Sequence, residues 1–180
     1  EELGNYKDSM SKLVEASNNY SYNWAVDKLN QGQYAEAEKV FKELGDYQDS
    51  AQLMQEASNA ADYEEAANLM KKGDVAGAVK LLKDIVGYKD AEEQVEEIEE
   101  NYNKVKEYIA KDDRKAAVTL LEKLGNYENS VSLLAELTNA DNYANAVKYL
   151  EDGTYSKAAE LFKKLGTYED SEQQYENVNN

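Results

Sequence analysis

The chain has 180 residues, 42% of them hydrophobic and 32% charged, a balance typical of a folded domain with a sizeable core. Its 37 acidic and 20 basic side chains give a formal net charge of −17, so nucleic acids and anionic lipid surfaces are excluded as partners by repulsion. The absence of cysteine and histidine excludes thiol nucleophiles, disulfides, imidazole bases and nearly every transition-metal site. We therefore expect a non-enzymatic chain without cofactor or metal, whose partner is a neutral to basic protein or peptide.

The two ends of the chain and its apolar runs carry further expectations about its setting. The longest apolar runs, such as residues 116–121, are far shorter than the roughly 20 residues that a membrane span requires. The opening EELGNYKDSM has neither the basic start nor the apolar stretch of a signal peptide, and no initiator methionine, so we expect an excised or processed piece. Without cysteines, redox chemistry assigns no compartment.

A seven-residue motif opens the chain and recurs along it. LGNYKDS at 3–9 returns as LGDYQDS at 44–50, LGNYENS at 124–130 and LGTYEDS at 165–171, and in altered form as IVGYKDA at 85–91. Two tyrosine series and one turn series keep almost constant steps of 41, 41 and 39 or 41 residues. They are Tyr6, Tyr47, Tyr88, Tyr127 and Tyr168; Tyr22, Tyr63, Tyr102 and Tyr143; and Gly32, Gly73, Asp112 and Gly153. The chain is therefore predicted to hold four units in register, with a period of about 41.

Each unit is predicted to be a long helix, a tight turn and a short helix. Residues 49–73 lack proline, are rich in helix formers and end at Gly73, which suits a position just past a helix. Residues 75–85 have helical apolar spacing at Ala78, Leu81, Leu82 and Ile85. Asp49 is the predicted N-cap of the long helix, with Gln52 completing a capping box, and the arrangement repeats in two pairs. These pairs are Asp90 with Glu93 and Asp170 with Gln173.

The recurring motif is predicted to be a joint between units rather than a ligand site. Gly45 suits the left-handed conformation that ends the short helix, Tyr47 packs back on the unit, and Asp49 caps the next helix. Every residue type in the motif thus has a terminating, packing or capping role. The third copy has Val86 where the others have glycine and places Gly87 one residue later, which predicts a different bend there.

These elements predict an all-α fold that forms a single domain over residues 1–180. The predicted helical hairpins cover roughly 8–45, 49–86, 90–125 and 129–166, with a terminal helix at 170–180 and a partial helix at each end. Because a hairpin with one apolar face cannot bury that face alone, neighbouring units are expected to stack and leave an extended surface.

Four units share a pattern of small and large apolar residues about their turns. A small residue lies in each long helix, at Ala25, Ala66, Val105 and Ala146. An alanine lies in each short helix, at Ala37, Ala78, Ala117 and Ala158. A large apolar residue follows four positions after that alanine, at Phe41, Leu82, Leu121 and Phe162. Tyrosine follows the turn glycine at Tyr34 and Tyr155. This pattern resembles the tetratricopeptide repeat (TPR), although the proline of that family is absent and the period exceeds its usual 34.

The resemblance implies an α-solenoid of about four TPR-like hairpins that binds a peptide or helix in the concave groove of its first helices. The LGxYxDS form also resembles one common in proteins of Gram-positive gut bacteria, which implies an extracytoplasmic or cell-surface location. The extra seven or so residues are about two helical turns, and we expect them to lengthen the first helix without changing the face it buries.

The candidate groove residues lie on the first helix of each unit. The tyrosines of the second series, Tyr22, Tyr63, Tyr102 and Tyr143, offer a flat apolar face and a hydroxyl, so they either contact a ligand or pack between units. Positions that differ between units are candidates for selectivity. They are Asn23, Glu64, Asn103 and Ala144, and Asn30, Lys71, Ala110 and Glu151.

Two other groups of acidic residues are expected to have no chemical role. The run at 91–101 is predicted to be a solvated helix face with Val95 and Ile98 turned inward, rather than a calcium site. Asp112 and Asp113 lie at a turn, with no apolar pocket to raise a carboxyl pKa. The leading hypothesis is a protein-interaction scaffold; the alternatives are a structural spacer or assembly element of a cell-surface protein, and a saccharide-binding module.

Overall fold

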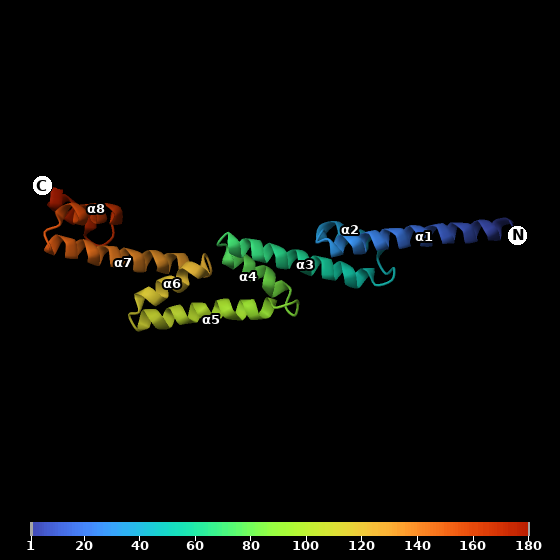
Figure 1. Cartoon of the computed structure of the whole chain (residues 1–180), viewed down its shortest axis with the longest axis horizontal. Helices are drawn as coiled ribbons and strands as arrows, with labels where there is room; N and C mark the ends of the chain where they lie inside the picture. The colour runs from blue at the N-terminus through green and yellow to red at the C-terminus, as the bar shows by residue number, and fades with distance from the viewer. Residues whose placement is uncertain (1, 180) are drawn as a thin grey trace. The chain divides into compact units, whose positions relative to one another are not determined.

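The structure, a computed structural model, describes residues 2–179, with side chains at residue 6 and from residue 8 onward. Every regular element in this range is an α-helix, as predicted (Figure 1). The helices are α1 (Glu2–Asn30), α2 (Tyr34–Leu44), α3 (Ser50–Lys71), α4 (Val75–Asp84), α5 (Ala91–Ala110), α6 (Arg114–Leu124), α7 (Ser130–Glu151), α8 (Tyr155–Leu165) and α9 (Ser171–Asn179). Asn180, the end of the predicted terminal helix, lies outside the described residues. None of the described helices combines the length and apolar character needed to cross a bilayer.

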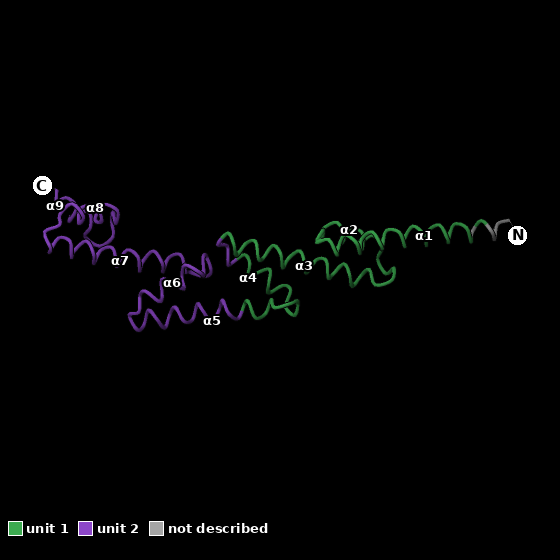
Figure 2. The backbone as a smooth tube through the Cα atoms, viewed as in Figure 1, with its two compact units in different colours: residues 1–72, 77–95 green, residues 73–76, 96–180 purple. Residues whose placement is uncertain are grey.

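Consecutive helices pack in series, and long helices alternate with short ones. Helix α2 packs on α1 and α3, α7 on α6 and α8, and α9 on α8. The chain divides into two compact units: unit 1 holds residues 1–72 and 77–95, and unit 2 holds residues 73–76 and 96–180 (Figure 2). Each unit has its own apolar core, formed in unit 1 around Ala25, Ala37, Phe41 and Ala57 and in unit 2 around Ala146, Ala158, Phe162 and Leu165.

The residues that define the sequence period are buried. All twelve members of the three apolar series are at most 1% exposed. Small residues on the long helix let the short helix approach closely, and the large residue of the short helix fills the space between them. The buried residues thus recur at the spacing of the sequence period. This recurrence does not distinguish one family of helical pairs from another, because any such pair must bury the same stripe.

Left-handed residues end the long helices where the turn series predicted them. Gly32, Gly73 and Gly153 have φ of 74°, 81° and 71°, and Asp112 takes the same position with φ of 55°. A residue with a Cβ is strained there by roughly 1–2 kcal/mol. The next residue, Asp113, accepts a hydrogen bond from the backbone N–H of Ala116 at 3.2 Å and so caps α6. The two adjacent aspartates therefore form a turn and a cap.

The first copy of the motif is not a joint, contrary to the prediction. Residues 3–9 lie within α1, which is continuous from Glu2 to Asn30. In the later copies a short helix precedes the motif, and its end fixes where the glycine must turn, as at Gly45 with φ of 57°. At residues 3–9 the helical conformation instead continues through the motif.

The altered joint at 85–91 turns at a different residue but gives its tyrosine the same backbone hydrogen bond. Helix α4 ends at Asp84, and the positive φ of 85° falls on Gly87, not on Val86. The Tyr88 N–H nevertheless bonds the carbonyl of Ile85 at 2.9 Å, as the Tyr47 N–H bonds that of Leu44 at 3.1 Å. The predicted difference is therefore confined to the residues before the tyrosine.

Candidate functional site

The first-helix tyrosines and the joint residues form a repeated cluster, which we call the clasp. In the first clasp the Tyr22 hydroxyl donates to Oδ1 of Asp49 at 2.5 Å, and its ring lies edge-on to Tyr47 with centroids 6.1 Å apart. Each clasp consists of a first-helix tyrosine, a joint tyrosine and an acceptor 27 residues after the first tyrosine. The four clasps are Tyr22–Tyr47–Asp49, Tyr63–Tyr88–Asp90, Tyr102–Tyr127–Asn129 and Tyr143–Tyr168–Asp170.

The clasp replaces the predicted side-chain cap of the long helices. Asp49 stands at the N-cap of α3, but its side chain makes no capping bond, so the capping box with Gln52 is wrong. With φ of −104° and ψ of 22°, its backbone is outside the extended region that aims an N-cap side chain at the first amides. At later joints the carboxylate instead accepts from a glutamine amide, Gln94 to Asp90 at 3.0 Å and Gln174 to Asp170 at 2.9 Å.

In the clasps of Asp90 and Asp170, hydrogen bonding shifts the pKa of both partners. Bonds donated by Tyr63 and then Gln94 lower the pKa of Asp90, and the corresponding bonds from Tyr143 and Gln174 lower the pKa of Asp170. Because the neutral hydroxyl is the donor, the same contacts raise the pKa of Tyr22, Tyr63 and Tyr143 above 10.0. These two clasps are thus most stable with the carboxyl ionised and the phenol neutral.

The first-helix tyrosines of the clasps are half-buried, and two of their rings already face a cation. The ammonium of Lys89 lies 4.4 Å from the ring centroid of Tyr63, and that of Lys106 lies 4.4 Å from that of Tyr102. Their hydroxyls are bonded within the clasp. These contacts occupy a ring face and the hydroxyl of Tyr63 and Tyr102, the groups that the sequence analysis considered for contact with a ligand.

The positions that vary between units are all exposed. Each of the four helix pairs presents two of them on its first helix. The two are seven residues or about two turns apart, so both lie on one side of that helix. The pairs are Asn23 and Asn30 on α1, Glu64 and Lys71 on α3, Asn103 and Ala110 on α5, and Ala144 and Glu151 on α7. Within unit 1 the structure therefore places Asn23, Asn30, Glu64 and Lys71 on the solvent side of helices whose other face is buried.

Asn126 is a site residue that the sequence analysis missed. Its side-chain Oδ1 accepts from the Ala76 N–H at 2.9 Å, and its Nδ2 donates to Asp74 at 2.7 Å. Its own backbone N–H bonds the carbonyl of Gly73 at 3.3 Å. The bond to Ala76 caps the free amides at the start of α4 from a residue 50 positions away. The motif position itself varies among Asp46, Asn126 and Thr167, which gave no signal of this contact.

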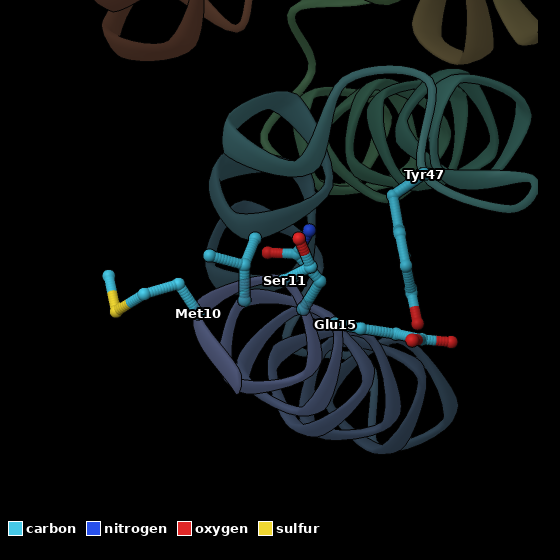
Figure 3. Close-up of a pocket in the computed structure, with 6 residues that line it drawn as sticks. Met10, Ser11, Glu15 and Tyr47 are labelled. Carbon is cyan, nitrogen blue, oxygen red and sulfur yellow. The ribbon is translucent and has the colours of Figure 1, made fainter. Parts of the chain in front are cut away.

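A shallow depression lies between the first half of α1 and the following joint. In Figure 3 the Glu15 side chain extends toward Tyr47, whereas the Met10 side chain points to the opposite side of α1. The depression is lined by Met10, Ser11, Val14, Glu15, Asn18 and Tyr47. It is open to solvent and holds one carboxylate, so it is not an enzyme-like cleft.

Comparisons with known proteins identify no family for the chain. No protein-family model matches it, and it matches neither a curated protein nor a solved structure. In the part of the chain that the structure describes, no group of three or more acidic side chains is placed to hold a metal ion. The exposed first-helix positions and the clasps are therefore the features of the described chain that bear on its function.

Proposed function

We propose that the chain is a non-catalytic interaction scaffold, an α-solenoid of four TPR-like helix pairs that binds a peptide or helix of another protein. The alternation of long and short helices and the burial of the three apolar series support this proposal. The binding surface is the exposed side of the first helices, formed in unit 1 by the pairs on α1 and α3 and in unit 2 by the pairs on α5 and α7.

One observation carries the proposal: the variable residues and the constant residues are separated in space. The constant apolar positions are buried and the constant tyrosines are bonded within the clasps. The residues that differ between units, such as Asn23, Glu64 and Asn103, are exposed at one register position. A fixed frame with changeable exposed positions is the arrangement by which repeat proteins select a partner.

Charge favours a neutral to basic partner. The chain carries a net charge of −17, which attracts a basic segment over about a Debye length, ~8 Å at physiological salt. Glu64 and Lys71 place charges of opposite sign about two turns apart on α3. A bound peptide is expected to contain a basic residue that pairs with Glu64.

The test is selection from a displayed library of random peptides, followed by affinity measurement on charge-swapped variants. The exchange Glu64→Lys with Lys71→Glu leaves the net charge unchanged, and we expect at least a tenfold loss of affinity. The control exchange, Lys39→Glu with Glu43→Lys, makes the same change on exposed positions of α2 and is expected to have no effect. Equal losses in the two variants, with intact helicity, contradict the proposed surface.

A structural spacer is the second candidate, and the clasps favour it. All four recurring tyrosine hydroxyls donate to acceptors of the same chain, so their recurrence is explained without a ligand. A spacer needs a repeated frame and no selective surface. If the peptide library yields no enriched sequence on a folded protein, the spacer is the function that remains.

A further inference from the structure

Helix α1 carries most of the large apolar side chains that the described structure leaves exposed. Tyr6 is 67% exposed, Leu13 64% and Tyr20 73%, with Met10 at 46% and Trp24 at 36%. In Figure 1 the N-terminal part of α1 runs beyond α2 and α3. An apolar patch of this kind on one helix is the usual mark of an interaction surface.

These five side chains form one stripe along the helix. With Ser17 they are spaced by 4, 3, 4, 3 and 4 residues, the alternation that defines the a and d positions of a coiled coil. We call this stripe the seam; it consists of Tyr6, Met10, Leu13, Ser17, Tyr20 and Trp24. At 3.6 residues per turn the seam lies roughly 150° around α1 from the side that packs in the core of unit 1. That core side includes Tyr22, Ala25, Val26 and Leu29.

The other first helices provide an internal control for the seam. Where α1 has Trp24, the three equivalent positions hold Glu65, Lys104 and Asn145, and all three are exposed. Where α1 has Tyr20, they hold Ala61, Glu100 and Asp141. Packing of the units therefore does not require these aromatic residues. Leu13 and Tyr6 differ, because their equivalents are also apolar or aromatic and pack within the chain. The equivalents of Leu13 are Met54, Val95 and Leu134, and those of Tyr6 are the joint tyrosines of the clasps.

We propose that the seam binds the same seam of a second copy of this chain, forming an antiparallel two-helix dimer. The seam is self-complementary about its midpoint: in an antiparallel pair Tyr6 faces Trp24, Met10 faces Tyr20, and the large Leu13 faces the small Ser17. Large residues opposite small ones interdigitate, as knobs-into-holes packing requires. An isologous contact of this kind closes on itself as a symmetric dimer.

Charge explains both why this segment can meet its own copy and why the pair is antiparallel. Of the 37 acidic and 20 basic side chains, only two of each lie within residues 6–24, so the seam segment is neutral in a strongly acidic chain. Asp8 and Lys12 pair with each other at 2.9 Å. Almost all the excess negative charge follows residue 24, and antiparallel pairing places it at opposite ends of the contact, where repulsion is smallest.

The seam segment is already helical within each chain, before any pairing. The C-terminal half of α1 packs in the core of unit 1 through Ala25 and its neighbours, and the helix continues from that half to Glu2. Two pre-formed helices lose less conformational entropy on pairing than two disordered segments. A seam of about 18 residues, roughly 27 Å, is therefore long enough for a dimer here, although it is short for an isolated coiled coil.

Sedimentation equilibrium over a range of concentrations tests the dimer. The wild-type chain is expected at twice its mass of 20.3 kDa. Tyr20→Glu with Trp24→Lys introduces the residues that α5 has at these positions, so folding is preserved, and it is expected to raise the dimer dissociation constant at least tenfold. The control, Val131→Glu with Tyr155→Arg, makes the same charge change at side chains 60% and 59% exposed in unit 2, and is expected to stay dimeric.

Three outcomes overturn the dimer proposal. They are a wild-type chain that remains a monomer up to millimolar concentration, equal dissociation of the seam variant and the control, and growth into species larger than a dimer. Circular dichroism of each variant separates these outcomes from unfolding.

Disulfide trapping tests the orientation, because the chain has no cysteine of its own. A mixture of Met10→Cys and Tyr20→Cys chains is expected to give the mixed disulfide in preference, since only facing residues come within disulfide reach. Homodisulfides formed by each variant alone, in place of the mixed product, overturn the antiparallel arrangement.

Discussion

The joint between α2 and α3 and the joint between α6 and α7 have nearly the same backbone but different surroundings. Gly45 has φ and ψ of 57° and −119°, and Gly125 has 53° and −123°. A Cβ on Gly45 meets nothing within 4 Å, whereas a Cβ on Gly125 lies 2.3 Å from the carbonyl oxygen of Gly73. The same motif thus makes a turn in one place, and in the other it makes both a turn and a close backbone contact. Local sequence specifies the turn and leaves the contact undetermined.

Substitution of the two glycines separates these roles and has the largest expected effect. Gly45→Ala introduces only the conformational strain of a positive φ, about 1–2 kcal/mol. Gly125→Ala adds a clash with backbone that cannot rotate away, and is expected to cost at least about 3 kcal/mol. Chemical denaturation measures both. Equal losses for the two variants contradict the close approach at Gly125.

The residue after each glycine gives the second comparison. Asn126 caps the start of α4, so Asn126→Ala is expected to cost about 1–2 kcal/mol, the usual value of a lost N-cap. Asp46 is exposed at the equivalent position. Asp46→Ala is therefore expected to change the free energy of unfolding by less than about 0.5 kcal/mol. Hydrogen exchange at the Ala76 amide is the local readout, and it is expected to increase in the Asn126 variant alone.

The joint at 85–91 ends in a buried alanine where the other joints have a buried serine. Ser50, Ser130 and Ser171 are fully buried with no partner for Oγ, while Ala91 takes the same position, also fully buried. Because an unsatisfied buried hydroxyl is unfavourable, Ser130→Ala is expected to stabilise the chain by about 1 kcal/mol. The reciprocal Ala91→Ser is expected to destabilise it by a similar amount. Loss of stability in Ser130→Ala, measured by thermal unfolding, contradicts this account.

Loss of a clasp hydrogen bond is expected to have the smallest effect on the free energy of unfolding. This effect depends on pH where the acceptor is a carboxylate, as at Asp90, and not where it is a carboxamide, as at Asn129. The pKa of Asp90 is lowered in the folded chain, so its bond from Tyr63 contributes stability above the ordinary carboxyl pKa of 3.8 and loses it as pH falls further. The pKa of Tyr63 is raised above 10.0, so the contribution is also lost as pH rises past that value. Asn129, the acceptor of Tyr102, does not titrate in acid.

Phenylalanine substitutions measure this difference directly. The stability lost in Tyr63→Phe is expected to shrink in acid, whereas the loss in Tyr102→Phe is expected to stay constant. Subtracting each variant from the wild-type chain at the same pH cancels the effect of net charge. Parallel acid profiles for the two differences contradict the role given to the Asp90 carboxylate.

Sequence reasoning succeeded where a residue's role depends on its own backbone and failed where it depends on a distant one. The helices, the buried series and the left-handed turns follow from periodicity and from Gly73 and its equivalents. The cap assigned to Asp49 was wrong because the motif suggested local donors, the first amides of the next helix, while the structure supplies Tyr22 as donor from 27 residues earlier. Asn126 was missed for the same reason. The spacing of the seam residues could be read from the sequence. Only their exposure showed that these side chains are not buried within the described chain.

Each clasp joins residues 27 positions apart, including those on either side of the shortened third period. During synthesis a clasp can close as soon as its own stretch has left the ribosome, without waiting for later residues. The chain therefore gains its order in steps from the N-terminus, and a nascent fragment exposes one unfinished stretch at a time. Such vectorial assembly lets a longer array of these units be made without long-range mispairing.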